Sequence, residues 1–175
     1  MRLLTLLLIW VMAAVGVGVG GAPVSSTAYA NPFAYCAAVG TIDAPDARWT
    51  GPAVPEVIAR GLQKAFGAPP DAPLEPFLRN SHWRCMDGKV YACNVGANIP
   101  CLEKADLSRT PSAPMTAYCK ANPGADVIPA YVTGRATVYT WRCEGSTAVI
   151  ERQVNQPDGR GFLARYWYEI PSPAL

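Results

Sequence analysis

The sequence predicts an α+β fold, in which a twisted antiparallel sheet of about four to six strands and about two or three short helices form one small, disulfide-stapled domain. Three observations support this prediction. Six cysteines follow an apolar leader, one segment has the periodicity of an amphipathic helix, and short runs of aromatic and β-branched residues alternate with turn signals. The 17 prolines and 15 glycines imply many turns, so cross-links are expected to supplement a modest core.

The first 30 residues are interpreted as a cleaved signal peptide. Arg2 is their only charged residue, an apolar run covers residues 3–12, and Ala28-Tyr29-Ala30 forms an A-x-A-like cleavage site. We therefore expect one exported domain of residues 31–175, periplasmic or secreted. A retained membrane anchor is the alternative, because the apolar character continues to Val24 and reaches the roughly 20 residues that a spanning helix needs. The four glycines within that stretch weaken such a helix.

Charge and hydropathy limit the classes of partner. Removing the leader takes Arg2 from the 15 basic residues and nothing from the 13 acidic ones, which leaves 14 against 13 with His82 neutral. The basic residues are scattered singly, whereas a phosphate backbone requires clustered cations, so no nucleic acid partner is expected. No apolar run after the leader is long enough to cross a bilayer, so no membrane contact is expected after cleavage.

The clearest helix signal covers residues 55–66. Val54, Ile58 and Leu62 recur at the spacing of one helical face, a proline occupies the first turn and a glycine follows directly. A second short helix is expected from Ser112 to Cys119, ended by an Asn-Pro-Gly sequence.

A β-hairpin is predicted over residues 81–93. Aromatic and β-branched residues flank Asp87-Gly88, a favoured two-residue turn that fixes the register and divides the side chains between two faces. The face expected to be buried holds Trp83, Cys85, Val90 and Ala92. The opposite face holds Arg84, Tyr91 and Cys93, so Cys85 and Cys93 are expected to have separate partners.

Three further strands are expected in the second half of the chain, at 136–143, 147–154 and 162–170. Gly145 lies at the turn between the first two, and a turn at 155–159 precedes the third. Strand alternation places Phe162, Ala164, Tyr166, Tyr168 and Ile170 on the apolar face of the closing strand. The outward face then holds Leu163, Arg165, Trp167 and Glu169.

The six cysteines are expected to form disulfides, because exported chains meet an oxidising compartment. They are Cys36, Cys85, Cys93, Cys101, Cys119 and Cys143. A Tyr-Cys pair precedes a Trp-Arg-Cys run twice, at 35–36 with 83–85 and at 118–119 with 141–143. If the cysteine of each Trp-Arg-Cys run is bonded to the cysteine of the Tyr-Cys pair that precedes it, the disulfides are Cys36–Cys85 and Cys119–Cys143. Cys93 and Cys101 then remain to form the third. Other connectivities stay open, and chance explains the recurrence at least as well as a duplication does.

Catalytic and metal-binding chemistry has little support. No C-x-x-C pair occurs, which argues against zinc and thiol exchange, and no cofactor motif is present. His82 is the single histidine, so any histidine-assisted mechanism must use it. Paired carboxylates are the other source of acid and base, and the available ones are Asp43, Asp46, Asp87, Glu144 and Asp158. Turn chemistry alone explains Asp87 and Asp158, which each precede a glycine.

The aromatic residues suggest a binding surface instead. Trp167 is expected to face outward between Arg165 and Glu169, where its ring could stack on a sugar or anchor a protein partner. The loop from Asn94 to Pro100 is expected beside it.

The leading hypothesis is therefore an exported, disulfide-stabilised, non-enzymatic binding protein of unknown protein or glycan partner, either inhibitor-like or envelope-associated. The general plan is similar to that of small periplasmic inhibitors of lysozymes or proteases, although no residue-level motif matches them. A small extracytoplasmic hydrolase using His82 or the turn carboxylates is the first alternative, and a structural envelope component is the second.

Overall fold

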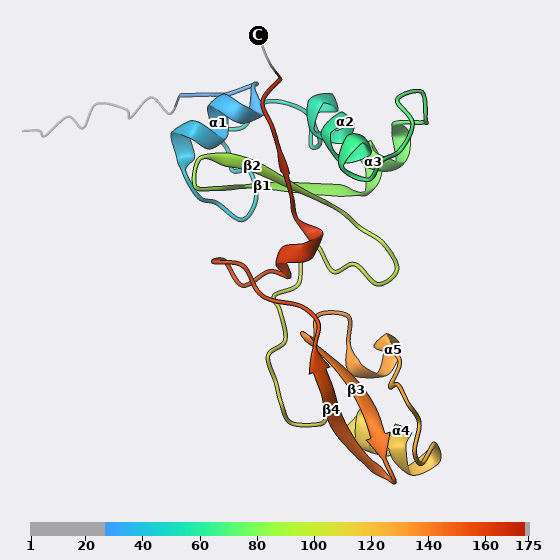
Figure 1. The fold of residues 1–175 in the computed structure, drawn as a ribbon. Coiled ribbons are helices and arrows are strands. Elements are labelled where there is room, and N and C mark those ends of the chain that lie inside the picture. The colour runs from blue at the N-terminus through green and yellow to red at the C-terminus, as the bar shows by residue number, and fades with distance from the viewer. Residues whose placement is uncertain (1–26, 174–175) are drawn as a thin grey trace, which may run out of the picture.

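A computed structural model describes residues 27–173 and shows two lobes joined by a narrow waist (Figure 1). The N-terminal lobe contains α1 (Pro32–Val39), α2 (Glu56–Ala65), α3 (Glu75–Asn80), β1 (Ser81–Met86), β2 (Lys89–Asn94) and β5 (Tyr168–Ile170). The C-terminal lobe contains α4 (Ala113–Ala121), α5 (Ala130–Thr133), β3 (Tyr139–Glu144) and β4 (Thr147–Gln153). A 3-10 turn, η1 (Ala164–Tyr166), lies in the waist. The predicted α+β class with antiparallel sheets and three disulfides is confirmed.

The strands form two sheets rather than one. The N-terminal lobe has the order β1-β2-β5, and the C-terminal lobe has the hairpin β3-β4. Each sheet packs on its own apolar core, and a third, smaller cluster in the waist unites Cys93, Cys101, Phe162 and Trp167. The chain passes through the waist twice, and the two passages bond to each other, since Ala105 N–H donates to the carbonyl of Gly161 over 2.7 Å.

Helix α2 forms where the apolar periodicity predicted it. Ile58 and Leu62 are fully buried and face the sheet of the N-terminal lobe. Gly61 allows the close approach of helix and strand, because a Cβ at this position would lie 2.5 Å from Cγ2 of Ile170 on β5. Any larger residue at position 61 would push α2 away from the strand.

The β1-β2 hairpin has the predicted register, with Cys85 opposite Val90 and Arg84 opposite Tyr91. Asp87 and Gly88 both have positive φ, at 53° and 76°, as a two-residue hairpin turn of the primed type requires. The face of Trp83 and Cys85 is buried as expected. The opposite face is covered as well, because the waist segment lies over it, and Arg84 is fully buried there.

Helix α4 and the β3-β4 hairpin of the C-terminal lobe also form where the sequence predicted a helix and two strands. The Ser112 side chain accepts the backbone N–H of Met115 and so caps α4, which ends before the Asn-Pro-Gly sequence. Strands β3 and β4 pair through a turn at Gly145. They are slightly shorter than predicted, since residues 136–138 lead into the strand without pairing to β4.

All three predicted disulfides are present: Cys36–Cys85, Cys93–Cys101 and Cys119–Cys143. In both lobes a cysteine on a helix is bonded to a cysteine on the first strand of a hairpin, at α1–β1 and α4–β3. The recurring Tyr-Cys and Trp-Arg-Cys units therefore occupy equivalent places in the two lobes. The third bond holds a loop at the waist.

The predicted closing strand at 162–170 is wrong over most of its length. Only Tyr168–Ile170 pairs, with β2, and residues 164–166 form η1. A 3-10 turn advances about three residues per turn instead of alternating by two, so it changes which side chains face inward. Leu163 and Trp167, expected on the outward face, are buried.

The signal-peptide prediction falls largely on residues 1–26, outside the described part of the chain. No helix within residues 27–173 has the length and apolar character needed to span a bilayer. Tyr29, in the expected cleavage site, is described. Its N–H donates to the carbonyl of Arg48 over 2.8 Å, its carbonyl accepts from Thr50 N–H over 2.9 Å, and its ring packs edge-on against Tyr35.

We expect a chain that begins at Thr27 to be more stable than one that begins at Asn31, by about 1 to 2 kcal/mol, the worth of two backbone hydrogen bonds. A new ammonium group at Asn31 would also lie at the N-cap of α1, where positive charge is unfavourable. Urea unfolding of the two chains measures the difference. Equal midpoints would mean that the Tyr29 contacts do not contribute to stability.

Candidate functional site

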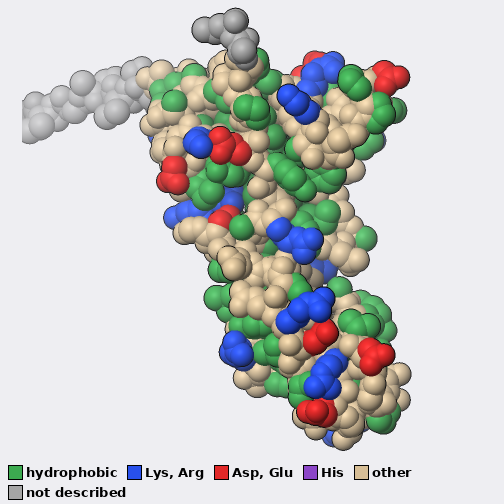
Figure 2. All heavy atoms as spheres, in the orientation of Figure 1, with side chains coloured by type: hydrophobic (Ala, Val, Ile, Leu, Met, Phe, Trp, Pro, Cys, Tyr) green, Lys and Arg blue, Asp and Glu red, His purple; other side chains and the backbone are tan. Residues whose placement is uncertain are grey.

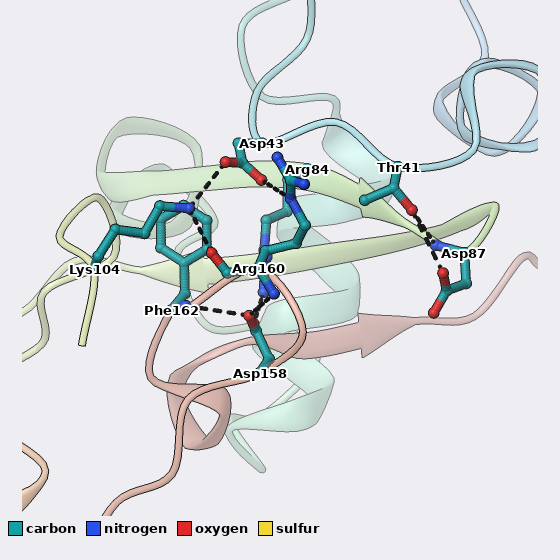
Figure 3. Close-up of polar contacts among 8 residues, drawn as sticks. All are labelled: Thr41, Asp43, Arg84, Asp87, Lys104, Asp158, Arg160 and Phe162. Atoms are coloured by element: carbon teal, nitrogen blue, oxygen red, sulfur yellow. Dashed lines mark hydrogen bonds and ion pairs between the residues drawn. The ribbon is translucent and has the colours of Figure 1, made fainter. Parts of the chain in front are cut away.

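A buried arginine organises the waist. Arg84 projects from β1 and forms an ion pair with Asp158, whose side chain is 8% exposed (Figure 3). Its guanidinium carbon lies 4.5 Å from the ring centre of Phe162 and 4.2 Å from that of Trp167. Nε and Nη1 of Arg84 have no acceptor within residues 27–173, so the two rings replace hydrogen bonds on much of the guanidinium. Sheet and waist segment are thereby held together.

Asp43 forms a second ion-pair cluster beside the first. Its Oδ1 accepts from Nε of Arg160 at 2.8 Å and its Oδ2 from Nζ of Lys104 at 2.9 Å (Figure 3). The hydrogen bond from Arg160, followed by that from Lys104, lowers the pKa of Asp43 to about 2 against the effect of burial. Lys104 Nζ also lies 3.4 Å from the ring centre of Phe162. Three separate chain segments therefore meet here.

Three neighbouring hollows also lie in the waist, and we call them together the waist groove. Their volumes are about 120, 260 and 470 Å³. Tyr166 lines the first two, Arg165 lines the first and third, and Asn155 lines the last two. The 470 Å³ hollow lies within the usual range for ligand pockets, roughly 300–1,000 Å³, and the groove as a whole is large enough for a small ligand.

The centre of the waist groove is a small polar cluster. Nη1 of Arg165 donates to Oδ1 of Asn155 over 3.3 Å, and the guanidinium carbon lies 5.3 Å from the ring centre of Tyr166. Arg165 has no carboxylate partner in the described chain, unlike Arg84 or Arg160. It is also the sole Lys, Arg, Asp or Glu among the lining residues of the three hollows.

One wall of the groove comes from the loop closed by the Cys93–Cys101 disulfide. Asn94 and Ile99 line the smallest hollow, and Asn98 lines the 260 Å³ hollow. The bond joins residues only eight apart and both sulfurs are buried, so it constrains this loop directly. The groove wall is therefore fixed before any ligand arrives.

The predicted surface of Trp167, Arg165 and Glu169 is divided by the structure. Trp167 is 7% exposed and packs on Phe162, so the prediction that it faces outward is wrong. Glu169 does face solvent, where it pairs with Lys89 at 3.0 Å and accepts from Tyr91. Arg165 alone joins the predicted loop from Asn94 to Pro100 in the groove. The groove itself could not be found from strand alternation, because η1 interrupts the strand.

The groups suggested for hydrolysis are not assembled into a site. The His82 side chain makes no hydrogen bond to any described residue, and burial lowers its pKa. Four of the five carboxylates have polar partners: Asp43 with Lys104 and Arg160, Asp46 with Arg48, Asp87 with the hydroxyl of Thr41, and Asp158 with Arg84. The fifth, Glu144, pairs loosely with Arg142 at 3.5 Å. Within residues 27–173 no group of three or more His, Cys, Asp or Glu is placed to hold a metal ion.

A further hollow of about 500 Å³ lies between α2 and the proline-rich loop. The amide of Gln63 donates to the carbonyls of Pro69 and Ala72, and Arg60 pairs with Glu56, while Lys64 has no ion-pair partner among the described residues. The waist groove is the better candidate, because its Arg165 lies beside aromatic rings and a loop closed by a disulfide, which the lining of this hollow lacks.

Basic and acidic side chains lie interspersed on the face drawn in Figure 2, without an extended area of one sign. Such a surface gives no sign of a phosphate-binding track. No protein family, curated protein or solved structure was found to match this chain.

Proposed function

We propose that this protein is an extracytoplasmic binding protein that acts without catalysis and holds its ligand in the waist groove. The three disulfides are typical of an exported chain. The observation that favours binding is the meeting of the smallest and the largest of these hollows at Arg165, a cation without a carboxylate partner in the described residues. A cation left free in a groove is available to a ligand's negative charge.

The rigidity of the groove supports the same proposal. The Cys93–Cys101 bond restrains one wall, and the buried Arg84–Asp158 pair restrains the chain segment that bears Arg165. A wall that is already ordered loses little conformational entropy when a ligand binds, which favours affinity. The rival hydrolase needs polarised groups converging on one substrate atom, and His82 with its neighbours offers no such arrangement in the described chain.

Capture from the cell envelope and the culture medium tests the proposal, with the exported, oxidised protein as bait. We expect a ligand to be recovered by the native protein and lost, by roughly tenfold or more, with Arg165→Gln, because a charge-assisted hydrogen bond is removed. The matched control is Arg79→Gln, which changes an exposed arginine on α3 that does not line the groove. Equal recovery by the native protein and Arg165→Gln, with both variants folded, would refute the groove as the binding site.

The Cys93→Ala/Cys101→Ala variant provides a second test of the same proposal. It opens the loop that forms the groove wall, so recovery should fall even under conditions where the variant is still folded. Circular dichroism at the capture temperature checks the fold. Unchanged recovery by this variant would show that the wall does not need to be preorganised.

A further inference from the structure

We infer that the waist groove binds an acidic saccharide, meaning a sugar chain with a carboxylate on or beside a ring. This inference rests on the proposed function and names the class of ligand for the same site. It uses three properties of the groove: one free cation, neutral hydrogen-bonding side chains, and aromatic rings.

The charge of the lining fits a single carboxylate rather than a polyanion. Arg165 is exposed, and its one hydrogen bond, to Asn155, leaves most of its guanidinium donors free. The guanidinium matches a carboxylate in shape and can bind it through two parallel hydrogen bonds. A nucleic acid or another chain of closely spaced anions would need further cations, and the described lining contains none.

The neutral lining fits sugar hydroxyls. The side chains of Asn98 and Gln156 are exposed at the groove and make no hydrogen bond to other described residues. An amide presents both donors and acceptors, and so does a hydroxyl, so the two pair in either direction. Thr133 and Thr137 add hydroxyls to the same wall.

Two tyrosines offer ring surface to a sugar at the 260 Å³ hollow. Tyr166 lines it and is half-buried, and Tyr131 on α5 beside it is 84% exposed, whereas Tyr139 and Trp141 line it as buried residues. Trp141 is 2% exposed, and its indole N–H is buried without an acceptor in the described chain. A buried, unpaired donor is costly, so an oxygen of a ligand that reached it would gain a favourable hydrogen bond.

A peptide ligand is disfavoured by the backbone of β3. An extended peptide gains affinity by adding to a free strand edge. The edge of β3 away from β4 is already used, because Ile128 N–H donates to the carbonyl of Trp141 over 2.7 Å and Cys143 N–H to that of Ala125 over 2.8 Å. At this wall of the groove, a ligand can therefore be recognised by side chains that contact its rings and hydroxyl groups, but not by strand pairing with β3.

Titration of the exported, oxidised protein followed by NMR and calorimetry tests the inference with four probes. These are a digalacturonate, the matched neutral galactose disaccharide, a disaccharide containing N-acetylmuramic acid, and inorganic phosphate. We expect one or both acidic disaccharides to bind, with shifts at Arg165 and Tyr166, and at least tenfold weaker binding of the neutral one. Which acidic probe binds distinguishes a ring carboxylate from a lactyl carboxylate.

The variants separate recognition from folding. Arg165→Gln should weaken the acidic disaccharide by roughly tenfold to a hundredfold, Arg165→Lys by less, and Arg79→Gln not at all. Equal affinity for the neutral disaccharide, equal affinity for phosphate, or shifts confined to residues outside the groove would each overturn the inference. Failure of all saccharides, with envelope capture still dependent on Arg165, would overturn the ligand class and leave the proposed function standing.

Discussion

Replacing Arg84 by methionine is expected to lower the free energy of unfolding by about 3 to 5 kcal/mol, because breaking a buried ion pair leaves an uncompensated charge. Arg84 is fully buried and Asp158 nearly so. The loss also removes the cation from between Phe162 and Trp167. Urea unfolding followed by tryptophan fluorescence measures the change.

Two further variants make the Arg84 result specific. Arg79→Met breaks an exposed pair with Glu75 on α3 and should cost about 1 kcal/mol or less, as surface pairs do. Arg84→Met combined with Asp158→Asn should recover part of the loss, since the amide is neutral and its Oδ1 can still accept the backbone N–H groups of Arg160 and Phe162. A loss below about 1 kcal/mol for Arg84→Met would show that the ion pair is not what holds the waist.

Removal of the three disulfides one at a time should lower stability in the order of their loop lengths. The bonds join residues 49, 24 and 8 apart, for Cys36–Cys85, Cys119–Cys143 and Cys93–Cys101. Restriction of the unfolded chain predicts losses of about 4, 3.4 and 2.5 kcal/mol for the paired alanine variants. Denaturant midpoints of the three variants measure the order.

The comparison is fair because all six cysteines are buried, so the packing lost with each pair is similar. The reverse order would mean that contacts in the folded state, rather than the freedom of the unfolded chain, dominate. We expect the effect of the three disulfide variants on ligand capture to follow a different order from their effect on stability. Cys93→Ala/Cys101→Ala should have the smallest stability loss and the largest effect on ligand capture, because that loop forms the groove wall.

Local signals predicted most of the elements of this fold correctly. The periodicity of α2, the Ser112 cap of α4 and the Asp87-Gly88 turn each depend on residues within one short segment. The same is true of the register of β1 and β2, which a two-residue turn determines. The predicted disulfide pairing also agrees with the structure, although the recurring units had left other connectivities open and the bonded cysteines of these units lie 49 and 24 residues apart.

The waist is where sequence reasoning failed. Strand alternation placed Trp167 outward and Arg84 on the hairpin face opposite the one expected to be buried, yet both are buried against each other. Nothing near Arg84 in the chain indicates a partner 74 residues away at Asp158. Contacts over such a distance in sequence depend on how the two chain segments of the waist pack together. A short 3-10 turn is enough to turn the side chains beside it from the outward to the inward face.

The sequence by itself determined the α+β class, the principal helices and hairpins, and the disulfide-linked character of the chain, because these follow from periodicity, turn chemistry and cysteine content. Only the tertiary structure decided that the strands divide into two sheets and that Arg84 and Trp167 are both buried in the waist. It also decided that Arg165 lines a groove without a carboxylate partner among the described residues. The physical reason is that burial, charge pairing and the shape of a groove are set by segments far apart in the chain, which no local pattern describes.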